Sequence, residues 1–178
     1  MYKITAPFDD TALQALRAGD SVLLSGTIYT ARDAAHKRMV ETLQNGGRLP
    51  VDLAGQVIYY AGPTPAKPGQ VIGSCGPTTS GRMDAYAPLL IERGLRGMIG
   101  KGERTDEVYR AMQEYGCVYL GAVGGAGALI SKCVRSCELV AYEDLGTEAI
   151  RRLVVVDMPL TVIGDIYGGN LYRQRAPR

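Results

Sequence analysis

The segment from Gly73 to Asp84 reads Gly-Ser-Cys-Gly-Pro-Thr-Thr-Ser-Gly-Arg-Met-Asp, with three hydroxyl residues, Thr78, Thr79 and Ser80, at its centre. Strand-forming residues precede the segment, and apolar residues at helical spacing follow it. A strand that enters a helix through such a turn leaves several amide N–H groups unpaired. With Arg82 in the first turn of the helix, these amides and hydroxyls predict a socket for an anion. A capped helix without a ligand would show the same local pattern.

Length and composition indicate one domain without a nucleic-acid partner. The chain has 178 residues, of which 46% are hydrophobic and 21% charged, enough for one sizeable core. The net charge is +2, tryptophan is absent, and the basic residues are mostly spread along the chain, so nucleic acid is not an expected partner. The 23 glycines are about 13% of the 178 residues, whereas the usual share is about 7%. Such an excess is typical of chains with many tight turns or with backbone lying close to a ligand.

The sequence also predicts where the protein resides. The first ten residues lack the pattern of a signal peptide, and the longest uncharged run, residues 115–131, contains five glycines and is too short to span a bilayer. We therefore expect a cytoplasmic protein without a membrane partner. The four cysteines lack metal-site spacing, so no metal site is expected and reduced thiols are the simplest interpretation; they are Cys75, Cys117, Cys133 and Cys137.

Periodicity and helix-end signals predict an α/β domain with a mixed sheet and flanking helices. Expected strands lie at 3–6, 21–29, 56–61, 70–75, 97–99, 117–123, 139–142, 153–156 and 160–163, and expected helices at 11–18, 31–45, 86–93, 105–115 and 127–133. The strands at 56–61 and 70–75 are expected to form a hairpin, and Asp10 is expected to cap the first helix. Residues 1–172 are predicted to be a single domain, followed by a loose basic tail at 173–178.

Candidate chemical groups follow several of the predicted strands. Arg32 and His36 have helical spacing after one strand, Lys101 lies between two glycines after another, and a glycine-rich loop at 124–127 follows a third. Ligands collect at the carboxyl ends of strands in open α/β sheets, so these cations and Arg82 would suit a small dicarboxylate or a phosphate. Arg32 could instead be a solvated surface residue, and His36 a structural residue paired with Asp33.

The familiar complete sites are missing from the sequence. The glycines of 121–127 do not give a dinucleotide fingerprint, and Lys101 is followed by glycine where a phosphate-binding loop needs Ser or Thr. No Ser-His-Asp or Cys-His arrangement and no close pair of carboxylates is apparent. An incomplete site, completed by another chain, is therefore the sharper interpretation.

Taken together, these segments resemble the C-terminal region of iron–sulfur class I fumarases, which in split members is a separate beta subunit, as it also is in L(+)-tartrate dehydratase. The resemblance rests on Ser-Gly-Thr-Ile (25–28) with Arg32, Asp33 and His36, Tyr-Tyr-Ala-Gly-Pro (59–63), Gly-Pro-Thr-Thr-Ser-Gly-Arg-Met-Asp (76–84), Gly-Lys-Gly (100–102), Tyr-Leu-Gly (119–121) with Gly124 and Gly125, Ala-Tyr-Glu-Asp-Leu-Gly (141–146) and Glu-Ala-Ile (148–150). It covers nearly the whole chain in order.

The resemblance implies a swivelling β/β/α-type domain that docks on an alpha subunit carrying a [4Fe–4S] cluster, with no cluster ligand in this chain. By the resemblance, Arg32, Arg82 and Lys101, with Thr79 beside them, bind the carboxylates of the substrate. Thr78 lies where the family's proposed base lies, and His36 is the second candidate for proton transfer or an orienting residue.

The implied reaction is the reversible hydration of fumarate to (S)-malate in a heteromer, with a homodimer or an α₂β₂ assembly expected from the family. Fumarate is favoured over tartrate by Gly-Arg-Met-Asp at 81–84 and Tyr-Glu-Asp-Leu-Gly at 142–146. A tartrate dehydratase subunit, a stand-alone module that binds carboxylate or phosphate without catalysis, and a purely structural subunit remain alternatives.

Overall fold

A mixed β-sheet is the centre of the computed structural model, which describes residues 1–122 and 127–174. Within these residues, seven strands form one sheet in the order β1-β2-β3-β4-β5-β7-β6. The strands are β1 (Tyr2–Ala6), β2 (Ser21–Thr30), β3 (Val57–Tyr59), β4 (Gly97–Gly100), β5 (Val118–Gly121), β6 (Val134–Ala141) and β7 (Ile150–Gly164). The helices are α1 (Asp10–Ala15), α2 (Asp33–Gln44), α3 (Ala87–Glu92), α4 (Asp106–Tyr115), α5 (Gly127–Ser131) and α6 (Leu171–Gln174), with 3₁₀ turns η1 (Ser80–Met83) and η2 (Glu143–Glu148).

The sheet contains both parallel and antiparallel pairs, and five of its strands form a closed ring. Strands β1 to β5 pair in parallel, whereas β7 runs antiparallel to β2, β5 and β6. Because β2 pairs with both β3 and β7, the strands β2, β3, β4, β5 and β7 close into a ring. The predicted α/β class with a mixed sheet and flanking helices is confirmed.

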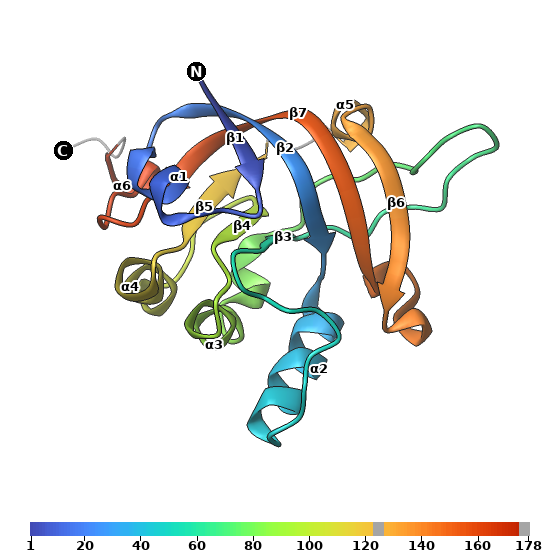
Figure 1. Cartoon of the computed structure of the whole chain (residues 1–178), viewed down its shortest axis with the longest axis horizontal. Helices are drawn as coiled ribbons and strands as arrows, with labels where there is room; N and C mark the ends of the chain where they lie inside the picture. The colour runs from blue at the N-terminus through green and yellow to red at the C-terminus, as the bar shows by residue number, and fades with distance from the viewer. Residues whose placement is uncertain (123–126, 175–178) are drawn as a thin grey trace.

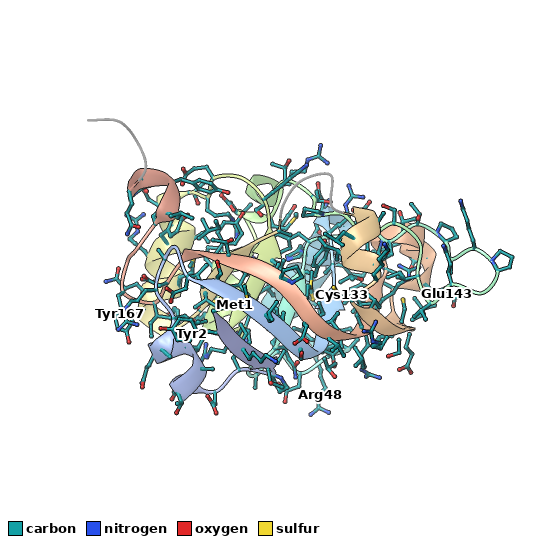
Figure 2. All side chains as sticks on the ribbon, turned by 90° about the horizontal axis from the view of Figure 1, so that it is seen from above. Met1, Tyr2, Arg48, Cys133, Glu143 and Tyr167 are labelled. Carbon is teal, nitrogen blue, oxygen red and sulfur yellow. The ribbon has the colours of Figure 1, made fainter. Side chains whose placement is uncertain are left out.

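Two apolar cores separate three layers. Alternate side chains of β3 point to opposite sides: Val57 and Tyr59 are buried between the strand layers, and Ile58 and the following Tyr60 are buried against the helices. The helices α2, α3 and α4 lie side by side below the strands, while β2 and β7 cross above them (Figure 1). Seen from above, this long pair runs across the molecule, with Tyr167 near one end and Glu143 near the other (Figure 2). None of the described helices is long and apolar enough to cross a membrane.

The expected hairpin of 56–61 and 70–75 is wrong. The first run contains β3, but β3 pairs in parallel with β2 and β4, and 70–75 contains no strand. The backbone of the loop folds back only locally, through the Thr64 amide to the Ser74 carbonyl (3.0 Å) and the Gly73 amide to the Thr64 carbonyl (3.2 Å). Three prolines at 63–68 supply no N–H group for a ladder, so the segment leaves the body as the long loop at the right of Figure 1.

Two other expectations on element ends are corrected. The first helix begins at Asp10 and ends at Ala15, and its cap is Asp9, whose Oδ1 accepts from the Ala12 amide at 2.8 Å. The two late strands expected at 153–156 and 160–163 are one strand of 15 residues, β7. Asp157, at φ 49°, lies where the β2–β7 register shifts between Leu24 and Gly26. This irregularity resembles a β-bulge, which lets the strand continue past an unpaired residue.

Parts of two predicted segments lie outside the described residues. Of the glycine loop at 124–127, only Gly127 is described, and it begins α5. Of the predicted tail, Arg173 and the residue after it belong to α6, Arg173 forms an ion pair with Asp106, and 175–178 are not described. The boundary between domain and tail stays a prediction.

Candidate functional site

The candidate residues meet at the carboxyl edge of three neighbouring parallel strands. Strand β2 ends two residues before Arg32, and β4 ends immediately before Lys101. The ladder continues past the strand ends, since the Ala31 amide donates to the Tyr59 carbonyl (3.1 Å) and the Tyr60 amide to the Ile99 carbonyl (2.8 Å). Parallel pairing therefore places Arg32, Tyr60 and Lys101 along one edge, which is where open α/β sheets bind ligands.

The Thr78–Arg82 segment crosses this edge. The Thr78 amide donates to the Tyr60 carbonyl at 2.7 Å, and the Ser80 amide donates to the Lys101 carbonyl at 2.8 Å. Thr79 and Lys101 also form an isolated parallel bridge. The structure thus brings Thr78, Thr79 and Lys101 together, with Arg82 exposed in the 3₁₀ turn η1 that follows.

The predicted socket of free amides needs correction. The segment enters the four-residue turn η1 instead of an α-helix, and α3 begins only at Ala87. The amides of Thr78 and Ser80 are already used by backbone carbonyls, so they cannot bind an anion. An anion at this segment would therefore be bound without these two amides.

The cationic side chains at this edge are available to a ligand. Arg82 and Lys101 are exposed, and Arg32 is half-buried. None of the ion pairs among the described residues involves Arg32, Arg82 or Lys101. Cations that lie at one strand edge without carboxylate partners are suited to bind an anion with more than one carboxylate or phosphate group.

Arg32 lies against the backbone of Gly62. A Cβ atom at Gly62 would approach both Cδ and Nη1 of Arg32 to 3.0 Å, which is tighter than ordinary packing allows. The absence of a side chain at Gly62 therefore lets the guanidinium lie against the start of the long loop. The Arg32 Nε atom is buried and has no hydrogen-bond partner.

His36 is fully buried at the start of α2. Its Nδ1 lies 2.8 Å from the Arg32 carbonyl, so Nδ1 is the protonated nitrogen of the neutral ring and Nε2 keeps a lone pair. Burial lowers the pKa of His36 to about 4, although the bond to the Arg32 backbone raises it. The ring packs edge-on to Tyr60, with centroids 5.3 Å apart. His36 is therefore neutral at pH 7 and contacts the Arg32 backbone; the structure gives no hydrogen bond from its side chain to Asp33.

Unpaired polar atoms concentrate beside this edge. Among the described residues, five buried side-chain N or O atoms lack a hydrogen-bond partner, and three of them belong to Arg32, Asp33 and His36. Buried polar groups are normally hydrogen-bonded, so unpaired ones call for a partner or a special role. Their concentration at the first turn of α2 agrees with a binding function there.

Several residues of this region were not found from the sequence. Arg104 and Asp84 form a buried ion pair of 2.6 Å, and the Ser80 hydroxyl lies 2.7 Å from the Tyr119 hydroxyl. Asp84 and Tyr119 lie within motifs, but no sequence signal pairs Arg104 with either of them. A charged residue directly before a helix is ordinarily expected in solvent.

The cysteines do not form a cofactor site in the part of the chain that is described. All four thiols are free, and burial raises the pKa of Cys75 and of Cys117 to about 12, so both are protonated and poor ligands. No group of three His, Cys, Asp or Glu side chains in 1–122 and 127–174 could hold a metal ion. The described residues do not fit an iron–sulfur cluster.

Fold and site together define a β/β/α domain that presents cations and a threonine at a strand edge. Comparison with known proteins gives the family: the model of the family "Fumarase C-terminus" matches residues 3–175. The chain belongs to this family, and the resemblance found in the sequence is confirmed.

Relatives with related names support the assignment. The chain is 40% identical to "Fumarate hydratase class I, aerobic" of Escherichia coli over 85% of the chain and 28% of that protein. It is 38% identical to "Fumarate hydratase 2" of Leishmania major, over 86% and 28%. It is 39% identical to "Putative L(+)-tartrate dehydratase subunit beta" of Methanocaldococcus jannaschii, over 89% and 85%. The chain thus spans little more than a quarter of the two fumarate hydratases.

Proposed function

We propose that this chain is the beta subunit of an iron–sulfur hydro-lyase that adds water reversibly to fumarate and gives (S)-malate. The observation that carries the proposal is the set of cations Arg32, Arg82 and Lys101 at one strand edge, without carboxylate partners among the described residues. A dicarboxylate would satisfy them. Family membership and the names of the E. coli and L. major relatives supply the reaction.

Each residue has a role in this proposal. Arg32, Arg82 and Lys101 bind the two carboxylates, and Thr79 lines the same site. In the dehydration direction, the deprotonated Thr78 side chain takes the proton from the carbon next to a carboxylate, and an acid of the alpha subunit protonates the leaving hydroxyl group. In hydration, Thr78 returns its proton to that carbon. A threonine is a weak base at pH 7, so the neighbouring cations must favour its deprotonated form.

His36 is better suited to orient Arg32 than to transfer protons. Its low pKa keeps it neutral, and the ring lies packed against Tyr60 with its Nδ1 bonded to the Arg32 carbonyl. A general acid or base works best with a pKa near the operating pH. We therefore place the proton transfer on Thr78 and give His36 the task of fixing the first turn of α2.

The rest of the active site is proposed to come from an alpha subunit. The E. coli and L. major relatives contain much more chain than this one, and the described residues do not form a cluster site. The [4Fe–4S] cluster would belong to that partner, where it would act as a Lewis acid on the substrate. An α₂β₂ assembly or a homodimer is the expected form, and free thiols suit a cytoplasmic location.

A tartrate dehydratase beta subunit is the second candidate. It is favoured by the M. jannaschii relative, of which this chain covers 85%. Tartrate and malate both carry two carboxylates beside a hydroxyl group, so the cations described above suit either acid.

Co-expression with a candidate alpha subunit tests the proposal. The purified complex is reconstituted with iron and sulfide under anaerobic conditions and assayed with fumarate, malate and tartrate, with this chain alone as the control. We expect turnover only in the reconstituted complex, and the preferred acid decides between the two candidates. Turnover by this chain alone contradicts the shared site. A folded chain that binds dicarboxylates but supports no turnover with any partner would be an anion-binding module.

A further inference from the structure

Arg104 and Asp84 form a buried ion pair directly behind the candidate site. Arg104 is 3% exposed and Asp84 9%, and the Arg104 Nε donates to Asp84 Oδ1 at 2.6 Å. Asp84 Oδ2 accepts from the Thr105 amide at 2.7 Å, and Arg104 Nη2 donates to the Tyr60 hydroxyl at 3.1 Å. Desolvation alone would lower the pKa of Arg104, but Tyr60 and Asp84 more than offset it, so the guanidinium stays charged.

The pair connects the two segments that present the candidate binding groups. Asp84 directly follows η1, which contains Arg82, and Arg104 lies in the loop that begins with Lys101 and leads into α4. The same two segments are also joined by the Ser80 amide, which donates to the Lys101 carbonyl at 2.8 Å.

A second set of buried contacts fixes the spacing between the segments. The Ser80 hydroxyl lies 2.7 Å from the Tyr119 hydroxyl, and Tyr119 donates to the Gly102 carbonyl at 2.8 Å. The Arg104 guanidinium carbon lies 4.8 Å from the centre of the Tyr119 ring, within the range of a cation–π contact. Arg104, Asp84, Tyr119 and Ser80 thus form a connected polar network under the Lys101 loop.

We infer that Asp84 and Arg104 are positioning residues, which hold Arg82 and Lys101 at the spacing that the two carboxylates of the substrate require. This inference rests on the proposed function. A buried ion pair is often no more stabilising than apolar residues of the same volume, so net stability alone does not account for it. The donors of the arginine guanidinium are fixed in one plane, so its hydrogen bonds set the relative orientation of the two segments, which apolar packing does not do.

The test uses Arg104→Lys, which keeps the charge and the stem but loses the fork. The matched control is Val155→Ala, which leaves a cavity in the core between the strand layers, where Val155 is 1% exposed. The two variants are compared at temperatures at which their folded fractions are equal. In the reconstituted complex, we expect Arg104→Lys to lower kcat/KM for the dicarboxylate about 10- to 100-fold, mainly through KM. The control should leave kcat/KM near that of the wild type.

Combining Arg104→Lys with Lys101→Ala separates positioning from a general structural role. Because Arg104 is inferred to set the spacing between Arg82 and Lys101, the double variant should lose less kcat/KM than the product of the two single losses. Losses in kcat/KM that simply multiply, or an Arg104→Lys complex that matches the Val155→Ala control, would overturn the inference.

Hydrogen exchange on the full chain provides a readout that does not need turnover. The Ser80 amide, bonded to the Lys101 carbonyl, should exchange faster in Arg104→Lys than in the Val155→Ala control. If the wild-type complex is inactive with all three acids, the hydro-lyase proposal fails, and this comparison alone decides the positioning role. Equal exchange of the Ser80 amide in the two variants would then overturn it.

Discussion

At the scale of single residues, His36 gives the stability of the chain a dependence on pH. Its pKa is about 4 in the folded chain and 6.5 in the reference state. Between these values the unfolded chain binds a proton that the folded chain does not, so the free energy of unfolding decreases as the pH falls. We expect a loss of about 2 kcal/mol between pH 7 and pH 5 from this residue, measured by urea unfolding.

The variant His36→Asn is the control for this prediction. Its side-chain amide keeps an N–H donor close to the position of Nδ1, which bonds to the Arg32 carbonyl, and it does not titrate. Hydrogen bonds to arginines lower the pKa of the exposed carboxylates of Asp106 and Asp144. Their protonation therefore affects the free energy of unfolding mainly below pH 5. If His36→Asn loses as much stability as the wild type between pH 7 and pH 5, the claim that His36 is buried in its neutral form is wrong.

Single residues were predictable where a local motif marked them. Lys101 was predicted as a site residue because it lies between two glycines, and Thr78 and Thr79 because they lie in a run of hydroxyl residues in a turn. Arg104 and Asp84 could not be paired in this way, since their ion pair joins segments 20 residues apart and depends on burial. The roles of Thr78, Arg82 and the other site residues stay predictions.

At the scale of elements, the fit of β4 against η1 makes a prediction about Gly100. A Cβ atom at Gly100 would lie 2.0 Å from the Ser80 Oγ and 2.8 Å from Cδ2 of Tyr60. Both neighbours are buried, so Gly100→Ala must displace them, and we expect it to cost about 1 to 3 kcal/mol of unfolding free energy. Chemical denaturation of the full chain measures this cost.

The control for Gly100→Ala is Gly81→Ala, where the nearest atom to the added Cβ is the Glu103 carbonyl oxygen at 3.8 Å. That distance is an ordinary contact, so the stability of this variant should change little. Equal effects of the two substitutions would mean that β4 and η1 do not pack as closely as described.

Most elements followed from apolar periodicity, and the exceptions have physical causes. Helices α2 and α4 and the strand β4 lie within one or two residues of the expected ranges, because their apolar spacing and their end signals agree. The run 70–75 forms no strand because its expected partner, β3, is already paired with β2 on one edge and with β4 on the other. The two halves of β7 were separated in the prediction because the residues between them resemble a turn, and only the pairing with β2 makes them one strand.

At the scale of the whole molecule, the candidate site is open to solvent, which supports the proposal that a second chain completes it. Arg82, Lys101 and Thr79 are exposed at the strand edge, and closure of this edge by the proposed partner would strengthen their electrostatic interactions with a substrate. The sequence suggested an incomplete site because an obvious acid–base pair was missing, but geometry was needed to show that the cations gather at one edge. The partner, the cluster and the substrate remain proposals.

The most direct measurement is kcat/KM for fumarate in the reconstituted complex that contains Arg82→Ala. The control is Arg135→Ala, since Arg135 is exposed on β6, which is not one of the strands whose ends carry the candidate residues, and its side chain donates to the Lys132 carbonyl. We predict that both variants assemble with the alpha subunit, that Arg82→Ala lowers kcat/KM about 100-fold or more, and that Arg135→Ala matches the wild type. Near-normal kcat/KM in the Arg82→Ala complex would contradict a substrate site at this edge.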